Sequence, residues 1–127
     1  MKEQLEKLLN NSYSPYSNYP VAAIVVTKDG KYFGGVNVEN ASYGGTICAE
    51  RNAITSAITA GYKKGDFQEL YVMVKGEKPA FPCFLCRQTI SEFFDSDSSL
   101  IILNEEEELH YFMSDILPHP FTSEDLK

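Results

Sequence analysis

The three cysteines of the chain limit its possible chemistry more than any other feature. Cys48 is followed two residues later by Glu50. Cys83 and Cys86 lie in a Pro-Cys-x-x-Cys run that begins at Pro82. Three protein ligands leave the fourth tetrahedral position of zinc open for water, as in catalytic zinc sites, whereas structural sites close all four positions. The spacing therefore predicts one catalytic zinc ion per chain.

Glu50 is placed to handle protons at such a site. Alone, a glutamate in the first turn of a helix is ordinarily a partner of the helix dipole. Two residues after a metal ligand, its carboxylate can come within hydrogen-bond reach of water on the metal, as a general acid and base must. We therefore expect Glu50 to be the catalytic residue.

The expected helix starts at Cys48 and Cys83 favour thiolate over thiol, because unpaired N–H groups and the positive end of the helix dipole lie there. Cys83 and Cys86 are three residues apart, so they share one helix face. Three thiolates on one zinc ion carry a net charge of about −1. Arg51 and Arg87 are the cations that we expect to offset it.

Two other uses of the cysteines remain open. A structural zinc site of the Cys₃His kind could be closed by His110 or His119, the two histidines of the chain. Cys83 and Cys86 could instead form a thioredoxin-like redox pair, which leaves Cys48 unused. Neither alternative explains Glu50. An odd number of cysteines argues against a disulfide framework and for a reducing, cytoplasmic compartment.

The pattern of apolar residues predicts a single α/β domain over residues 1–127. We expect helices over residues 2–10, 48–61 and 83–94, and strands over residues 21–27, 32–38, 70–74 and 100–103. The first two strands form a hairpin, and strands then alternate with helices, which indicates a mixed sheet covered by helices. The acidic run 105–108 reads as a solvated loop or helix start rather than a metal cluster.

The charge balance limits the partners. A formal charge of −7 and a pI near 4.7 argue against nucleic acid, which is bound through Lys and Arg. A small uncharged substrate suits this chain better. No apolar run approaches the ~20 residues of a membrane span, and the N-terminus lacks a signal-peptide profile, so we expect no membrane partner.

Five motifs in order carry a resemblance to a known family: residues 16–21, 37–43, 48–51, 82–88 and 117–126. On these motifs the chain resembles the small zinc-dependent cytidine deaminases of the three-cysteine, homotetrameric type, over nearly its whole length. The resemblance implies a cytidine deaminase-like fold. This fold is a three-layer α/β/α arrangement with a mixed sheet of about five strands, an antiparallel hairpin plus parallel strands.

By that resemblance, Cys48, Cys83 and Cys86 bind Zn²⁺ and Glu50 transfers protons. Water activated by zinc adds to C4 of cytosine, ammonia departs, and the product is uridine or 2′-deoxyuridine, as in pyrimidine salvage. The backbone N–H of Ala49 would hold O2 of the base. The carbonyl of Phe81, kept extended by the following proline, would accept from the amine.

Asn37 and Glu39 match the family residues that hold the ribose 3′-hydroxyl. A carboxylate there repels a 3′-phosphate, so internal positions of a polynucleotide should be excluded. Tyr19 stands where an aromatic ring meets the base or sugar. Phe121 and Tyr43 are expected to reach the site of a neighbouring subunit, which implies a homo-oligomer, a tetramer, with pockets completed by neighbours.

Some positions depart from the family pattern. Phe84 and Ala22 replace glycines, and we expect them to add bulk near the site; Phe81 replaces Ser or Thr, and Val36 replaces a Cys. These departures concern substrate preference more than reaction type. A deaminase of a modified cytosine nucleoside such as blasticidin S is the nearest alternative, followed by a non-catalytic structural zinc domain. A polynucleotide deaminase is disfavoured by the acidic charge.

Overall fold

A hairpin of strands β1 (Val21–Thr27) and β2 (Tyr32–Val36) begins the sheet in the computed structural model, which describes residues 1–127. The β-branched, apolar sequence of β1 favours a strand. Gly30, at φ 88°, supplies the positive φ that the turn needs. The hairpin is therefore confirmed, with β2 two residues shorter than expected.

The sheet has five strands in the order β2-β1-β3-β4-β5. β3 (Phe67–Val74) runs antiparallel to β1 and parallel to β4 (Phe94–Leu103). β5 (Glu108–Phe112) is antiparallel to β4. The mixed sheet is confirmed, but the sequence pattern does not predict β5. Its side chains are mostly exposed, so no apolar pattern marks the strand, and it forms by backbone pairing with β4.

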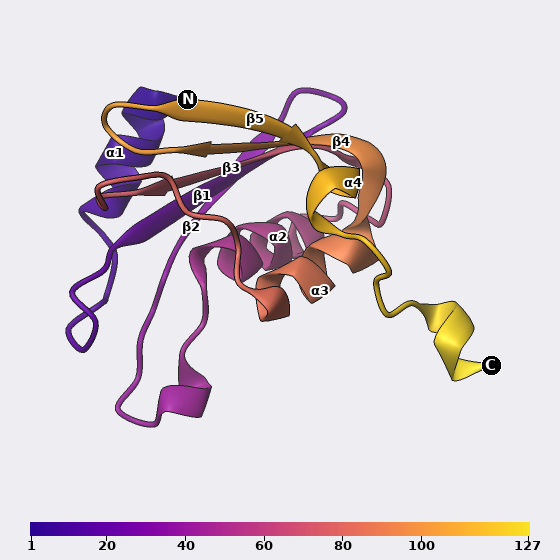
Figure 1. Ribbon diagram of the computed structural model, residues 1–127, viewed down its shortest axis with the longest axis horizontal. Helices are drawn as coiled ribbons and strands as arrows, with labels where there is room; N and C mark the ends of the chain where they lie inside the picture. Colours follow the sequence, from indigo (N-terminus) through magenta and orange to yellow (C-terminus); the bar gives the residue numbers. More distant parts are fainter.

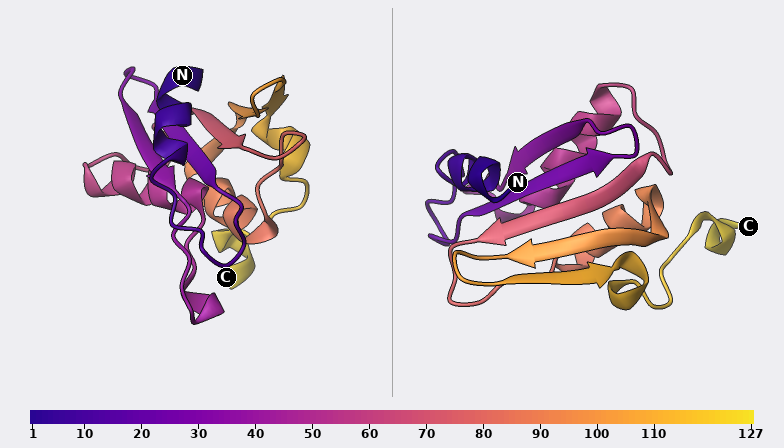
Figure 2. Two further views of the ribbon diagram at one scale, coloured as in Figure 1. Left: turned by 90° about the vertical axis from the view of Figure 1, so that its left-hand side faces the viewer. Right: turned by 90° about the horizontal axis from the view of Figure 1, so that it is seen from above.

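Helices cover both faces of the sheet, which confirms the three-layer arrangement (Figures 1 and 2). α1 (Lys2–Leu9) lies on one face and buries Leu5 and Leu9 against it. α2 (Ala49–Thr59) and α3 (Phe84–Phe93) lie on the other face, over the larger core. All three match the expected helices to within two residues at each end.

Gly35 in β2 allows α2 to sit unusually close to the sheet. A Cβ atom at this position would lie 2.4 Å from the backbone nitrogen of Ala53 and 2.6 Å from the carbonyl oxygen of Ala49. Glycine is the residue that permits such backbone contact. The contact fixes the first turns of α2, which carry the residues described below.

Two short segments extend away from the layers (Figure 1). One is the loop that contains the 3₁₀ helix η1 (Tyr43–Gly45), and the other is the C-terminal segment after α4 (Met113–Ile116), which ends in η2 (Ser123–Leu126). None of the helices combines the length and apolar character that crossing a bilayer requires.

Candidate metal centre and substrate pocket

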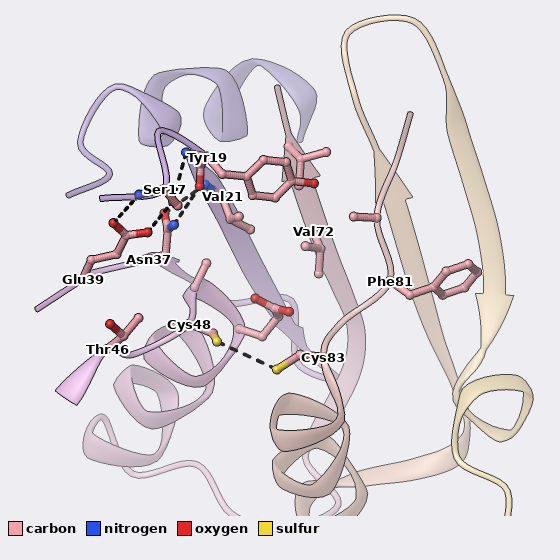
Figure 3. Close-up of a pocket in the computed structure, with 14 residues that line it drawn as sticks. Ser17, Tyr19, Val21, Asn37, Glu39, Thr46, Cys48, Val72, Phe81 and Cys83 are labelled. Atoms are coloured by element: carbon pink, nitrogen blue, oxygen red, sulfur yellow. Dashed lines mark hydrogen bonds between the residues drawn. The ribbon is translucent and has the colours of Figure 1, made fainter. Parts of the chain in front are cut away.

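The cysteines meet where α2 and α3 begin, as predicted. Cys48 is the N-cap of α2 and Cys83 the N-cap of α3. The Sγ atoms of Cys48 and Cys83 are 4.0 Å apart (Figure 3). The Sγ of Cys83 accepts the backbone N–H of Cys86 at 3.5 Å. All three sulfur atoms lie within 4.8 Å of one another. Two helix starts thus bring three thiols to one point.

The chemistry of this group fits zinc with an open position. Its donors are three soft sulfur atoms of cysteines that form no disulfide, and it contains neither histidine. His110 lies instead on β5, exposed, with its Nε2 atom 2.7 Å from the Glu108 carboxylate. The closed Cys₃His alternative therefore lacks its fourth ligand. A redox pair of two cysteines would leave the adjacent Cys48 without a role.

The thiols share their protons unequally. The pKa of Cys48 is lowered to about 5, chiefly because the Cys86 thiol donates to it, with further contributions from Arg51 and Cys83. The pKa of Cys86 is raised, because its proton is held by Cys48 and its surroundings are buried. At neutral pH the group therefore already holds a thiolate, the form that binds metal.

The two arginines occupy different places. Burial lowers the pKa of Arg51, but the hydrogen bonds and charges of Cys48 and Cys86 together outweigh it, so the pKa of Arg51 is raised overall. Its Nη2 atom donates to the carbonyl of Thr46 at 3.1 Å, and its buried Nε has no partner. Arg87 donates from Nε to the carbonyl of Pro82 at 2.8 Å, and its guanidinium lies 4.6 Å from the centre of the Phe84 ring. Arg51 thus lies next to the thiols, whereas Arg87 is hydrogen-bonded to the backbone just before α3.

Glu50 lies in the first turn of α2 and lines the same pocket as Cys48 and Cys83. Its side chain is buried, with 5% relative exposure. Burial penalises the charged carboxylate and raises the pKa of Glu50 to about 7. A carboxyl group with such a pKa can both accept and release a proton near neutrality.

Asn37 and Glu39 are brought to one side by an extended segment. Val38, between them, exchanges two backbone hydrogen bonds with Ile47, each 2.9 Å long. On the other edge, Tyr13 donates to the Asn37 carbonyl at 3.0 Å and accepts the Glu39 N–H at 2.8 Å. Because side chains alternate along an extended chain, Asn37 and Glu39 share a side.

The side-chain amide of Asn37 is fixed by three hydrogen bonds. Its Oδ1 accepts from the Ser12 hydroxyl at 2.5 Å and from the Val21 N–H at 2.9 Å. Its Nδ2 donates to the Tyr19 carbonyl at 2.9 Å. These partners define which end of the amide is oxygen, and they leave one N–H of Nδ2 for a ligand.

Glu39 is held by the preceding loop. Its Oε1 accepts the backbone N–H groups of Tyr16 at 3.0 Å and Ser17 at 3.1 Å, and its Oε2 accepts the Ser17 hydroxyl. The Ser17 hydroxyl is the main cause of the lowered pKa of Glu39. The site therefore presents an ionised acceptor beside the free donor of Asn37, which suits a hydroxyl group.

One cavity of about 410 Å³ joins the thiols of Cys48 and Cys83 to these polar residues (Figure 3). Eight predicted site residues line it: Tyr19, Asn37, Glu39, Cys48, Ala49, Glu50, Phe81 and Cys83. Sequence reasoning missed six others: Ser17, Val21, Thr46, Val72, Val74 and Ala80. Ser17 lies inside the 16–21 motif and could have been found there, whereas valines of a buried strand look like ordinary core. Nine of the fourteen lining residues are hydrophobic, as in pockets for small molecules.

Tyr43 and Phe121 lie outside the pocket of their own chain. Tyr43 is 79% exposed on η1, with its ring edge-on to Tyr16 at 6.2 Å between centroids. Phe121 is 54% exposed, and its carbonyl accepts from Gln88 on α3. Their expected contact with a neighbouring subunit stays a prediction.

The expectation that Ala22 adds bulk near the site is wrong. Ala22 is fully buried in the core beneath α1, on the face of the sheet opposite the thiols, whereas its neighbour Val21 lines the pocket. Phe84 is 80% exposed, stacks on Arg87, and does not line the pocket either. Neither residue narrows the cavity of its own chain.

Comparisons with known proteins agree with this geometry. A family model described as the cytidine and deoxycytidylate deaminase zinc-binding region matches residues 1–101. Cytidine deaminase of Mycoplasma genitalium is 35% identical over 115 residues, which cover 91% of this chain and 87% of that protein. Cytidine deaminase of Halalkalibacterium halodurans is 37% identical over 116 residues, 91% and 86% of the two chains. A crystal structure of cytidine deaminase from Burkholderia pseudomallei matches with a TM-score of 0.89 and 40% identity, covering 94% of each chain.

Proposed function

The chain belongs to the cytidine and deoxycytidylate deaminase family, and from that premise we propose that it hydrolyses cytidine and 2′-deoxycytidine to uridine and 2′-deoxyuridine. One observation carries the proposal: a single cavity joins the thiols of Cys48 and Cys83 and a buried carboxyl group to a hydroxyl-binding pair, and the third thiol lies within 4.8 Å of the other two. Water is consumed and ammonia released, so that the exocyclic amine of the base is replaced by a carbonyl.

Cys48, Cys83 and Cys86 are proposed to hold the metal. Zinc bound there would supply a Lewis acid that makes water nucleophilic at neutral pH. Glu50 would take one proton from the attacking water and give it to N3 of the ring. It would then take the second proton from the hydroxyl group added at C4 and pass it to the amine as the C4–N bond breaks. Its pKa of about 7 suits both directions of transfer.

Backbone groups are proposed to orient the base. The N–H of Ala49 belongs to the first turn of α2, where N–H groups have no partner within the helix, so it can donate to O2 of the ring. The carbonyl of Phe81 is proposed to accept from the amine. The ring of Phe81 packs instead against Tyr111, 5.0 Å between centroids. Val72 and Val74 supply an apolar wall.

Asn37 and Glu39 are proposed to bind the 3′-hydroxyl of the sugar as donor and acceptor. Glu39 would accept a hydrogen bond from the hydroxyl group, while the remaining N–H of Asn37 would donate one to its oxygen. The same carboxylate would repel a 3′-phosphate, and the formal charge of −7 adds to that repulsion. We therefore propose a free nucleoside rather than a polynucleotide as substrate. Ammonia release from cytidine, compared with a cytosine-containing oligonucleotide, tests this point.

Glu50→Ala tests the reaction itself. The variant should keep one zinc per chain and its fold while kcat for cytidine falls by about 10²–10⁴-fold, the usual contribution of general acid–base catalysis. The matched control is Glu106→Ala, which removes an exposed carboxylate between β4 and β5 and should change nothing. A Glu50→Ala protein with wild-type turnover would refute the proposed function.

We also propose that the enzyme is a cytoplasmic homotetramer that serves pyrimidine salvage. Three unpaired thiols suit a reducing compartment. Tyr43, Phe84 and Phe121 expose large aromatic surface outside their own pocket, which supports burial by other subunits. Sedimentation should give a particle of about four 14.3 kDa chains. A monomer with full activity would refute the proposal that neighbouring subunits complete the pocket.

A further inference from the structure

Ser17 links Tyr19 and Glu39 at the end of the pocket that Asn37 and Glu39 line, here called the sugar end. Its hydroxyl donates to Oε2 of Glu39 and accepts the backbone N–H of Tyr19 at 3.1 Å. Its own N–H donates to Oε1 of Glu39. Ser17, Tyr19 and Glu39 all line the cavity, and Figure 3 shows Ser17 between the other two. One side chain therefore spans from the aromatic residue to the carboxylate.

These contacts leave Glu39 with little freedom. An ionised carboxylate has about four acceptor positions. Three are filled, two by the N–H groups of Tyr16 and Ser17 and one by the Ser17 hydroxyl. The remaining position is on Oε2, the atom that Ser17 holds through its hydroxyl. Without the hydrogen bond from the Ser17 hydroxyl, Oε2 would be free to rotate, because the two backbone N–H groups hold Oε1 alone.

We infer that Ser17 is a positioning residue for substrate binding, which aims the free acceptor position of Glu39 at the 3′-hydroxyl of the nucleoside. The inference rests on the proposed function. It goes beyond it by assigning a role to a residue that touches the sugar-binding carboxylate and is distinct from the metal, the proton-transfer group and the base contacts. The lowered pKa of Glu39 agrees with donors held against its charged form.

A substrate that lacks the 3′-hydroxyl separates positioning from a general structural role. For Ser17→Ala, kcat/KM with cytidine should fall by about tenfold, mainly through KM, because a charge-assisted hydrogen bond is lost. With 3′-deoxycytidine the same substitution should change kcat/KM by less than about twofold, since this substrate has no 3′-hydroxyl for Glu39 to bind. Equal losses on both substrates, or no loss on either, would overturn the inference.

Two further variants sharpen the test. Ser17→Thr keeps a hydroxyl and should restore most of the cytidine activity, while Ser56→Ala, which removes an exposed hydroxyl from α2, should leave both substrates unaffected. In a Glu39→Ala background, adding Ser17→Ala should cost less than about twofold more with cytidine, because residues that act as a unit are not additive. Additive losses would contradict a role through Glu39.

Binding of the reaction product distinguishes failure of this inference from failure of the proposed function. Calorimetry with uridine and 3′-deoxyuridine requires no turnover. Ser17→Ala should weaken uridine binding by about tenfold and leave 3′-deoxyuridine binding unchanged. Absence of ammonia release by the wild-type protein would reject the proposed function. A Ser17→Ala protein that binds uridine as tightly as wild type would reject the inference alone.

Discussion

The two ends of the pocket are held by different kinds of interaction. At the metal end, the thiols stand at the starts of two helices whose inner faces, including Ala53, Ile54 and Ile90, are fully buried in the larger core. At the sugar end, Asn37 and Glu39 are held by hydrogen bonds from a partly exposed loop.

This difference indicates how each end should respond to change. Buried packing places the thiols as a unit, so loss of one ligand should remove the metal altogether. At the sugar end each hydrogen bond contributes only part of the binding energy, so the loss of one should lower substrate binding by a limited factor and leave the metal in place. The following variants test that contrast.

Removal of a buried ligand should have the largest effect. Cys86→Ala leaves two thiols, too few for the predicted site, so zinc content and ammonia release should both fall to background. Metal analysis and a deamination assay on one preparation measure both. Thr89→Ala, on the same helix, is the control and should retain metal and activity. A Cys86→Ala protein with full zinc and turnover would show that the metal lies elsewhere.

Asn37→Ala should affect the sugar end without releasing zinc. It removes three internal hydrogen bonds and the free N–H, so kcat/KM should fall by about 10²-fold and unfolding free energy by about 1–3 kcal/mol. Kinetics, urea denaturation and metal analysis give the three quantities. Loss of zinc from this variant would contradict the independence of the two ends.

Gly35→Ala tests the packing that positions the metal end. The added Cβ would meet backbone atoms of α2, so the variant should be less stable by about 1–3 kcal/mol, the usual cost of overpacking. Gly44→Ala is the matched control, because no atom lies within 4 Å of the Cβ it would add. Equal stability of the two variants in urea would mean that α2 moves away from β2 freely.

Glu39→Gln should give the smallest effect, visible in the pH dependence of stability. The folded pKa of Glu39 is lowered from 4.5, so its hydrogen bonds stabilise the protein fully above that value and lose their effect as pH falls through the folded pKa. The Tm difference between wild type and Glu39→Gln should therefore stay constant from pH 7 to about 5 and shrink below. A difference that grows on acidification would show that Glu39 is not held as an anion.

The sequence predicted the parts of the molecule that depend on local spacing. Cys48, Glu50, Cys83 and Cys86 follow from helix starts and three-residue spacing, and the hairpin follows from Gly30 after the β-branched run of β1.

Features that depend on pairing between distant residues could not be predicted. β5 is exposed and has no apolar pattern, so only its pairing with β4 defines it. Ala22 was expected near the site, but successive side chains of a strand point to opposite faces, so Val21 lines the pocket and Ala22 packs under α1. The bond from Ser12 to Asn37 joins residues 25 positions apart, and no local pattern indicates it.

X-ray absorption at the zinc edge tests the central claim most directly, because it reports the atoms around the metal in the active protein. Three thiols and an open position predict three sulfur neighbours at about 2.3 Å and one light neighbour at about 2.0 Å. A spectrum with an imidazole ligand, or with four sulfur neighbours, would mean that protein closes the site, and would contradict hydrolysis at this centre.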